Sequence, residues 1–308
     1  MSSIVVAMSG GVDSAVTACL LHAAGHNIMG IHMRTHSTSS SCRVLPPKND
    51  NNRQIGTCCS PYDARDASDV ADKIGFPFIA IGFEKNFEKN VIDPFISDYK
   101  NGRTPSPCVD CNNKVKMGEL VRRAEILGYD YVATGHYARI KDGRLYAAVD
   151  KNKDQSYYLA GLTPSQISRL LFPLGEFTKS YVRDLAREYG LEIAEKPDSQ
   201  EICFAPKGYR VFLESQGIVD TPGNFVSSSG TIVGTHKGVH NYTVGQRTGL
   251  GLEYRYVLRM NAEKNEIVVG SASERGTLTM MVGGWSWLST PMENVTVKIR
   301  SRSKACKV

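Results

Sequence analysis

A six-residue segment, Ser9-Gly10-Gly11-Val12-Asp13-Ser14, has the composition of a phosphate-binding loop. Adjacent glycines permit a sharp turn and let a ligand approach the backbone closely. The segment follows the apolar run 4–8 and precedes a stretch with helical periodicity. Backbone amides at the helix N-terminus and the serine hydroxyls would therefore face an anion. The lysine of the nucleoside-triphosphate P-loop and the spacing of the dinucleotide fingerprint are both missing, so the sequence predicts a phosphate site of another type.

Two cysteines, Cys108 and Cys111, lie three positions apart in the segment GRTPSPCVDCN at 102–112. Pro105 and Pro107 are expected to hold this chain extended, just before a helix that starts near Asn113. A helix N-terminus lowers the pKa of a thiol and favours the thiolate, which is the nucleophilic and metal-binding form. The pair indicates redox chemistry, metal binding or nucleophilic catalysis, although two partly buried structural thiols would give the same pattern.

A third cysteine, Cys203, lies in DSQEICF at 198–204. By itself such a cysteine is more often a small core residue than a reactive one. The combination is more informative, because a phosphate loop can activate an oxygen as a leaving group and thiols can replace it with sulfur. Eight cysteines without a secretion signal also predict a reducing compartment, with thiols kept for chemistry or metal.

These residues need a scaffold, and the first 200 residues predict a doubly wound α/β domain around a parallel sheet. Short apolar runs alternate with amphipathic stretches, as in βαβ units. Residues 34–57 break this pattern with polar residues and proline and are expected to form a long loop. Strands are expected at 4–8, 27–33, 76–82 and 130–134, and helices at 13–24, 61–74 and 113–127.

After about residue 205 the sequence changes to short β-branched segments separated by glycines, which predicts small β-rich structure. From Val295 to Arg302 apolar and basic residues alternate, which predicts one strand with a core face and a basic face. The basic face is either a solvated surface or a polyanion site. We expect three domains: 1–205 for catalysis, a small central domain at 206–272, and an incomplete C-terminal β-barrel domain at 273–308.

Composition narrows the class of protein. The 308 residues fit about two average domains, and no apolar run approaches the ~18 residues of a membrane span, so an integral membrane protein is excluded. The net charge of +6 comes almost entirely from residues 201–308. The first residues resemble no leader or presequence, so we expect a cytoplasmic protein. The sequence does not reveal the oligomeric state, and a monomer is the expectation.

The loop at 9–14 resembles the pyrophosphate loop of the PP-loop ATPases, which cleave ATP between the α and β phosphates. With the other motifs, the chain resembles the tRNA-specific 2-thiouridylases of that superfamily nearly from end to end. The matching segments are SGGVDS at 9–14, CCS at 58–60, GRTPSPCVDCN at 102–112, ATGHYAR at 133–139, KDQSYYL at 153–159, DSQEICF at 198–204, YTVGQR at 242–247 and GLG at 249–251.

The resemblance implies an ATP-dependent exchange of oxygen for sulfur at C2 of the wobble uridine of tRNA. Uracil O2 would be adenylated and then displaced by a persulfide sulfur, with release of AMP and pyrophosphate. Cys203 would carry the persulfide, loaded by a sulfur-donor protein, and Cys111 would help to release the sulfur, leaving a disulfide between the two cysteines.

The same resemblance assigns binding roles. Asp13 is expected to help hold Mg²⁺ beside the nucleotide. The ATP site would comprise Ala7, Met8, Ser9, Gly10, Gly11, Val12, Asp13, Ser14, Met33 and Gly135. The target base would contact Ser106, Pro107 and Cys108. The tRNA would contact Lys153, Asp154, Gln155, Arg300 and Ser301. His136 is expected to be structural or near the nucleotide rather than a general base.

Three alternatives stay open at this stage. Cys108, Cys111 and Cys203 could instead ligate a [4Fe–4S] cluster that binds sulfide on its open iron. The chain could be a PP-loop AMP-forming ligase that acts on a small molecule, or a non-catalytic tRNA-binding protein. The departures from the family pattern are Ser106, where Asn is usual, Ala15, where Ser is frequent, and an end at Val308, within the first expected strand of the C-terminal barrel.

Overall fold

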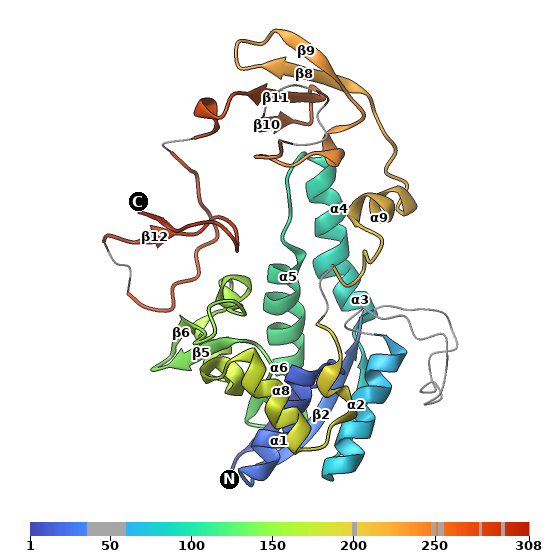
Figure 1. Ribbon diagram of the computed structural model, residues 1–308, viewed down its shortest axis with the longest axis vertical. Helices are drawn as coiled ribbons and strands as arrows, with labels where there is room; N and C mark the ends of the chain where they lie inside the picture. The colour runs from blue at the N-terminus through green and yellow to red at the C-terminus, as the bar shows by residue number, and fades with distance from the viewer. Residues whose placement is uncertain are drawn as a thin grey trace. The chain divides into compact units, whose positions relative to one another are not determined.

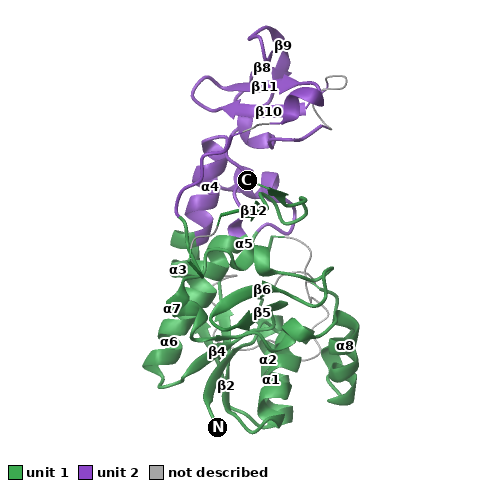
Figure 2. Cartoon of the chain, turned by 90° about the vertical axis from the view of Figure 1, so that its left-hand side faces the viewer, with its two compact units in different colours: residues 1–90, 108–204, 285–308 green, residues 91–107, 205–284 purple. Residues whose placement is uncertain are grey.

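The computed structural model describes residues 1–35, 60–198, 202–247, 251, 256–276, 279–290 and 293–307. Most of the loop expected at 34–57 lies outside these ranges, as do Cys58 and Cys59. The chain folds as two compact units, one formed by residues 1–90, 108–204 and 285–308, the other by 91–107 and 205–284 (Figure 2). The expected domain boundaries at 205 and 272 stay a prediction.

A five-stranded parallel sheet with strand order β3-β2-β1-β4-β7 forms the centre of the first unit (Figure 1). Ile4, Val5 and Val6 of the central strand are fully buried, and because neighbouring side chains point to opposite faces, both faces of the sheet are covered. This confirms the predicted α/β class, and the four predicted strands lie within two residues of their expected ends. The strands are β1 (Ser3–Ala7), β2 (Asn27–Arg34), β3 (Phe78–Gly82), β4 (Tyr131–Ala133) and β7 (Leu170–Leu171).

One face of the sheet is covered by α1 (Val12–Ala23), α2 (Pro61–Ile74) and α8 (Lys179–Glu188), whose apolar residues form one core with those of β1. Helix α2 begins after Ser60, which forms a capping box with Asp63, and ends at Gly75 in the left-handed conformation. The helices predicted at 13–24 and 61–74 are therefore confirmed.

The helix expected at 113–127 begins earlier than predicted. Three consecutive helical segments run from residue 107 to 126: α5 (Pro107–Asp110), the π-helix η2 (Cys111–Glu119) and α6 (Leu120–Ile126), which contacts β4. Pro107 occupies the first helical position, where its fixed φ suits the helix and its missing N–H is not needed. The expectation that Cys108 and Cys111 precede the helix in an extended segment is therefore wrong, and both lie in its first turns.

The smaller elements of the first unit include a short C-terminal hairpin. The strand expected at 295–302 contains only β12 (Thr296–Val297), which pairs antiparallel with β13 (Cys306–Lys307). A turn in which the Ser303 amide donates to the Arg300 carbonyl at 3.0 Å ends it, and Ile299, expected on a core face, is 62% exposed. The others are α3 (Glu84–Phe87), β5 (Ala138–Lys141), β6 (Arg144–Ala147), η3 (Ser156–Leu159), α7 (Pro164–Ile167), η4 (Pro173–Glu176) and η5 (Glu192–Glu195).

The second unit contains the β-rich structure expected after residue 205. A four-stranded sheet with order β10-β11-β8-β9 surrounds a core that includes Phe225, Val257 and Ile267. Helices α4 and α9 pack through aromatic pairs, with the rings of Tyr99 and Tyr209 stacked at 4.8 Å. The elements are η1 (Glu88–Ile92, which starts in the first unit), α4 (Asp93–Lys100), α9 (Tyr209–Ser215), β8 (Gly223–Ser227), β9 (Ile232–His236), η6 (Val239–Asn241), β10 (Tyr256–Asn261), β11 (Glu266–Gly270) and η7 (Ser273–Arg275).

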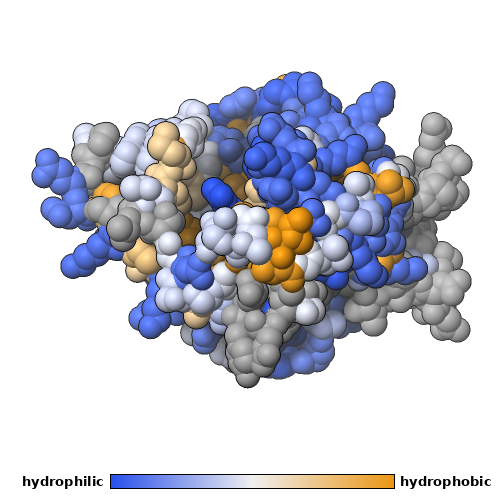
Figure 3. Space-filling view, turned by 90° about the horizontal axis from the view of Figure 1, so that it is seen from above, coloured by the Kyte–Doolittle hydropathy of each residue, from blue (hydrophilic) through white to orange (hydrophobic). Residues whose placement is uncertain are grey.

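One face of the molecule is largely polar (Figure 3). The face drawn in Figure 3 is mostly hydrophilic, with small apolar patches, in agreement with a mean hydropathy of -0.26. None of the helices in the described ranges combines the length and the apolar character that crossing a membrane requires.

Candidate active site

The loop Ser9–Ser14 connects β1 to α1 and is held in a tight turn. Gly10 has a φ of +76°, and a Cβ atom at this position would lie 2.2 Å from the carbonyl oxygen of Asp63, so only glycine fits. The Ser14 hydroxyl donates to the Gly11 carbonyl at 3.0 Å and accepts from the Ser9 amide at 3.1 Å. The loop is thus fixed at the N-terminus of α1, where helix amides bind anions.

A cleft of about 350 Å³ opens beside this loop. All of the predicted ATP residues line it except Gly10, which makes the turn behind it. Two predicted tRNA residues, Lys153 and Gln155, line the same cleft. The remaining lining residues are His32, Asp63, Lys116, Thr134, His136, Tyr137, Lys196, Pro197 and Asp198.

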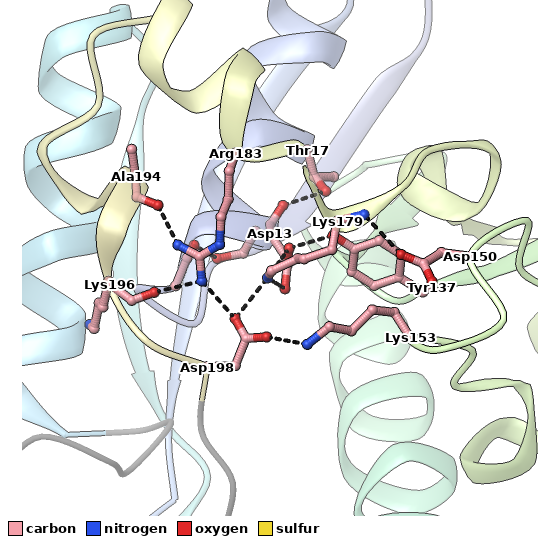
Figure 4. Close-up of polar contacts among 12 residues, drawn as sticks. Asp13, Thr17, Tyr137, Asp150, Lys153, Lys179, Arg183, Ala194, Lys196 and Asp198 are labelled. Atoms are coloured by element: carbon pink, nitrogen blue, oxygen red, sulfur yellow. Dashed lines mark hydrogen bonds and ion pairs between the residues drawn. The ribbon is translucent and has the colours of Figure 1, made fainter. Parts of the chain in front are cut away.

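Lys179, at the start of α8, links two carboxylates at this cleft (Figure 4). Its Nζ donates to both carboxylate oxygens of Asp13, at 2.7 and 2.8 Å, and lies 2.8 Å from Oδ1 of Asp198. The hydroxyl of Tyr137 also donates to Asp13, at 2.8 Å. The Lys179 side chain is only 10% exposed, so the two aspartates balance a nearly buried ammonium.

Asp198 also holds a second lysine, because its Oδ2 lies 2.7 Å from Nζ of Lys153. Burial by itself would raise the pKa of the Asp198 carboxyl, but the hydrogen bonds and positive charges of Lys153 and Lys179 lower it below its ordinary value. Asp198 is therefore ionised at neutral pH and connects a predicted tRNA residue with the residue that neutralises Asp13.

Lys196 joins the phosphate loop to α2. Its Nζ donates to the Gly10 carbonyl at 2.8 Å, to Asp63 at 2.7 Å and to Asp66 at 2.6 Å. The Asp63 side chain is 8% exposed and also caps α2 through Ser60. Lys196 thus places a positive charge at the cleft beside the turn of the loop, where a phosphate could compete with the two carboxylates.

The segment after β4 closes the other side of the loop. A Cβ atom at Gly135 would lie 2.8 Å from the carbonyl carbon of Asp13, so glycine lets the two backbones meet. His136 is buried, and its Nδ1 lies 2.7 Å from the Thr134 hydroxyl. Burial, helped by the charge of Lys116, lowers the pKa of His136 to about 3. The ring is therefore neutral at physiological pH, as a structural histidine would be.

The three cysteines of interest belong to two segments. Cys108 is exposed, Cys111 is half-buried in η2, and Cys203 is half-buried after the nucleotide cleft residues 196–198. No disulfide joins Cys111 and Cys203 in this structure. Among the described residues, which include all three cysteines, no group of three or more His, Cys, Asp and Glu side chains could hold a metal ion. The three thiols are thus not preassembled as a cluster site.

The predicted tRNA residues 153–155 have distinct partners. Asp154 accepts from the Ala148 amide at 3.0 Å and from the Ser156 hydroxyl at 2.9 Å, so it shapes the turn. The side-chain oxygen of Gln155 accepts from the Tyr137 amide at 2.9 Å. Of these three residues, only Lys153 has a positive charge. Its ammonium could leave Asp198 and pair with an RNA phosphate instead.

The other predicted RNA-binding residues belong to the C-terminal segment at 300–301 and to the segment at 106–108. The hydroxyl of Tyr157 donates to the Ile299 carbonyl, and that of Tyr158 lies 3.1 Å from the Ser301 hydroxyl. The segment with Arg300 and Ser301 is thereby tied to the one that follows Lys153. Ser106 directly precedes, and Pro107 begins, the helical segment that carries Cys108 and Cys111.

Sequence reasoning missed several cleft residues. Lys116 and Lys196 line the cleft, Lys179 binds Asp13 and Asp198 next to it, and Tyr137 contacts Asp13. The partners of Lys179, Lys196 and Tyr137 are far along the chain, so no local motif marks these residues. The one available signal was proximity, because Tyr137 falls within the ATGHYAR segment and Lys196 shortly before DSQEICF.

The parallel sheet and the phosphate loop between its first strand and first helix define a PP-loop ATPase domain. A family model described as the tRNA methyl transferase HUP domain matches residues 2–207, and one described as the tRNA methyl transferase PRC-barrel domain matches residues 210–271. The chain belongs to the family of tRNA-specific 2-thiouridylases, MnmA, which are tRNA sulfurtransferases.

Three relatives with this name illustrate the similarity. That of Leptospira biflexa is 46% identical over 99% of this chain and 82% of its own length. That of Geobacter metallireducens is 45% identical over 97% and 83%. That of Carboxydothermus hydrogenoformans is 47% identical over 88% and 75%. Among solved structures, a 4-thiouridine synthetase–RNA complex with bound ATP aligns with 70% of this chain and 50% of that one at 21% identity, with a TM-score of 0.39.

Proposed function

We propose that this protein uses ATP to replace O2 of the wobble uridine of tRNA with sulfur. Membership of the 2-thiouridylase family supports 2-thiolation of tRNA uridine. The observation that carries the proposal is that the phosphate loop and two predicted tRNA residues, Lys153 and Gln155, line one cleft. Nucleotide and RNA can therefore meet in it. A cytoplasmic location and a monomeric state remain part of this proposal.

The first step is adenylation of the base. Uracil O2 attacks the α-phosphorus of ATP, an O–P bond forms, and the bond from that phosphorus to the bridging oxygen of the β-phosphate breaks. Pyrophosphate leaves with the electron pair, and N3 of the uracil loses its proton to solvent. Lys179 and Lys196 lie where they can exchange carboxylate partners for phosphate oxygens and stabilise the charge that develops on them. The low pKa of His136 argues against its use as a base.

The residues at the cleft also suit Mg²⁺. One carboxylate with phosphate oxygens and water is a ligand set that Mg²⁺ accepts, and Asp13 supplies that carboxylate once Lys179 turns to the phosphates. The ion would neutralise negative charge on the departing pyrophosphate. Because no ready metal group exists among the described side chains, phosphate oxygens would have to complete the site.

The second step transfers sulfur. The terminal sulfur of a persulfide on Cys203 attacks C2, a C–S bond forms, and the C2–O2 bond breaks as AMP leaves with the oxygen. The thiolate of Cys111 then attacks Sγ of Cys203. The bond to the transferred sulfur breaks with its electrons on that sulfur, which yields 2-thiouridine and a Cys111–Cys203 disulfide. A dithiol reductant restores the thiols, and a persulfide donor protein reloads Cys203.

Mass spectrometry of tRNA nucleosides tests this proposal. With tRNA, ATP, a persulfide donor and a dithiol, the protein should form 2-thiouridine. Cys203→Ser should form none while still releasing pyrophosphate in a tRNA-dependent manner. Consumption of ATP without any 2-thiouridine would defeat the proposal, and pyrophosphate release that needs no tRNA would favour a small-molecule ligase.

Cys108 separates the persulfide scheme from an iron–sulfur cluster. A cluster would need all three thiolates, so Cys108→Ser should abolish thiolation together with bound iron and sulfide after anaerobic purification. The persulfide scheme predicts that Cys108→Ser retains part of its activity and that active wild-type protein contains no iron.

A further inference from the structure

Arg183 of α8 binds the stretch Ala194 to Asp198, which starts at the end of the 3-10 helix η5 and continues without regular secondary structure (Figure 4). Its Nη1 donates to the Ala194 carbonyl at 2.5 Å, and its Nη2 donates to the Lys196 carbonyl at 3.1 Å. The same Nη2 lies 3.4 Å from Oδ1 of Asp198. One guanidinium therefore contacts every second residue of this stretch. The Arg183 side chain is 22% exposed, so these contacts are partly shielded from water.

The stretch held by Arg183 is a wall of the nucleotide cleft. Lys196, Pro197 and Asp198 line the cleft, whereas Arg183 does not. Lys196 reaches the phosphate loop through the Gly10 carbonyl, and Asp198 binds Lys153 and Lys179. Arg183 thus fixes this wall from behind, on the side away from the space that a nucleotide would occupy.

The chain that leaves this wall leads to Cys203. Cys203 lies five residues after Asp198, so its Cα can be at most about 18 Å from that of Asp198. The next residue, Phe204, packs edge-on against Phe87 with ring centroids 5.8 Å apart, and Phe87 is 1% exposed. Cys203 therefore lies between two anchors, the carboxylate of Asp198 on one side and the ring of Phe204 on the other.

We propose that Arg183 is a positioning residue for the sulfur transfer step. By fixing residues 194–198 at the cleft wall, it sets where the Cys203 segment starts and hence whether the persulfide reaches C2 of the adenylated base. Arg183 does not itself line the nucleotide cleft, and its hydrogen bonds go to none of the predicted tRNA residues. It touches the cleft residues Lys196 and Asp198, but the Lys196 ammonium has its own contacts with Gly10, Asp63 and Asp66, so we expect adenylation to depend on Arg183 less than sulfur transfer does. This inference rests on the proposed function, because it assumes that Cys203 delivers the sulfur.

The guanidinium is suited to this role. Its planar fork presents several N–H groups in fixed directions, so one side chain binds two carbonyls and a carboxylate at once. A lysine would keep the charge but offers a single flexible ammonium and cannot hold these three points at once. Loss of the fork should let the wall shift, and a misplacement of about 1 Å can slow a chemical step by about 100-fold.

Single-turnover kinetics can separate the two steps. Protein carrying a Cys203 persulfide is mixed with tRNA and ATP, and the rates of pyrophosphate release and of 2-thiouridine formation are measured by rapid quench. For Arg183→Gln we expect pyrophosphate release within about twofold of wild type, with 2-thiouridine formation slowed roughly 10- to 100-fold. Arg183→Lys should lie between the two. Arg187→Gln is the matched control: it lies one turn on in α8, pairs with exposed Glu195, and should leave both rates unchanged.

The outcomes distinguish this inference from the proposed function. Equal slowing of both steps in Arg183→Gln, or of neither, would overturn the positioning role. If Arg183→Gln unfolds at too low a temperature for the assay, Arg183→Lys is tested in its place. It must then show the same selective loss of sulfur transfer. Wild-type protein that releases no pyrophosphate with tRNA would instead defeat the proposed function, and the positioning role with it.

Discussion

The two sides of the nucleotide cleft are built in different ways. On the phosphate-loop side, residues of one continuous segment, Ala7 to Ser14, shape the site through the backbone, with hydrogen bonds of 3.0 and 3.1 Å that join Ser14 to Gly11 and Ser9. The lysine side consists of Lys153 and Lys196, which line the cleft, and of Lys179 next to it. These lysines come from separate segments, and each is paired with at least one carboxylate. Shape thus comes from a local motif, whereas positive charge comes from long side chains gathered by the fold.

This difference has a functional consequence. Backbone geometry on the loop side leaves little freedom, so a substitution there should fail sterically. The lysines can exchange a carboxylate for a phosphate at little cost in geometry, because an ammonium has no fixed fork. We therefore expect the loop side to determine whether the nucleotide fits and the lysine side to determine how strongly its phosphates are held.

The largest effect is expected for Gly10→Ala on the loop side. The new Cβ would lie 2.2 Å from the Asp63 carbonyl oxygen and would also be strained at a φ of +76°, so α2 and the loop must separate. We expect affinity for a non-hydrolysable ATP analogue to fall by roughly 100-fold or more, equivalent to about 2.7 kcal/mol or more, measured by calorimetry.

Gly25→Ala is the matched control for this substitution. Gly25 has a similar φ of +80°, but a Cβ there meets no atom within 4 Å. It should lose only about 1–2 kcal/mol of folding free energy from backbone strain and should bind the nucleotide normally. Equal nucleotide affinities for the two variants would refute the view that close packing against α2 shapes the loop.

On the lysine side, Lys196→Met should have the next largest effect. The change removes an ammonium that lies 2.6–2.8 Å from Asp63, Asp66 and the Gly10 carbonyl. We expect roughly tenfold weaker binding of the ATP analogue and a free energy of unfolding lower by about 1–3 kcal/mol. Lys73→Met on α2, whose Nζ contacts the exposed Gly190 carbonyl, should change neither quantity by much. Unchanged nucleotide affinity in Lys196→Met would remove this lysine from the phosphate site.

The sequence predicts the locally encoded parts of the molecule, such as the phosphate loop, but not the contacts that the fold brings together. Four strands and two helices were placed within two residues, because hydrophobic periodicity and glycine ends are local signals. The loop Ser9–Ser14 was found for the same reason. The roles of Lys179 and Arg183 are not predictable in this way. Only the packing of α8 brings Lys179 to Asp13 and Arg183 to Asp198. A residue read in isolation as a solvated surface charge gives no sign of such a partner.

The errors have local physical causes as well. Pro107 was expected to keep the chain extended, yet a proline is equally suited to the first position of a helix, and the helix starts there. Alternation at 295–302 predicted a strand, but the turn between Arg300 and Ser303 stops it after two residues. In both segments the same residues are compatible with two local conformations. The rest of the fold determines which of the two forms.

Between the two sides, His136 gives a pH-dependent test. Its pKa is about 3 in the folded protein, below the ordinary value of 6.5, so between these values the unfolded chain binds more protons and stability falls as pH decreases. Wild type should lose up to about 1.4 kcal/mol per pH unit below pH 6.5 relative to His136→Gln, measured by urea unfolding from pH 7 to 5. Parallel pH profiles for the two proteins would show that the ring is not buried in its neutral form.

The smallest effects are expected where the lysine side meets the C-terminal segment. Tyr157→Phe and Tyr158→Phe each remove one hydroxyl contact, to the Ile299 carbonyl and to the Ser301 hydroxyl, and leave the aromatic packing in place. A neutral hydrogen bond contributes about 0.5–1.5 kcal/mol, so tRNA affinity should fall about two- to tenfold in a fluorescence anisotropy titration at fixed salt. Tyr146→Phe on β6, 40% exposed and away from that segment in sequence, serves as the control. If the tyrosine variants bind both tRNA and the ATP analogue as wild type does, Arg300 and Ser301 do not contribute to RNA binding through these contacts. In that case the RNA-binding surface does not extend from Lys153 to the C-terminal segment.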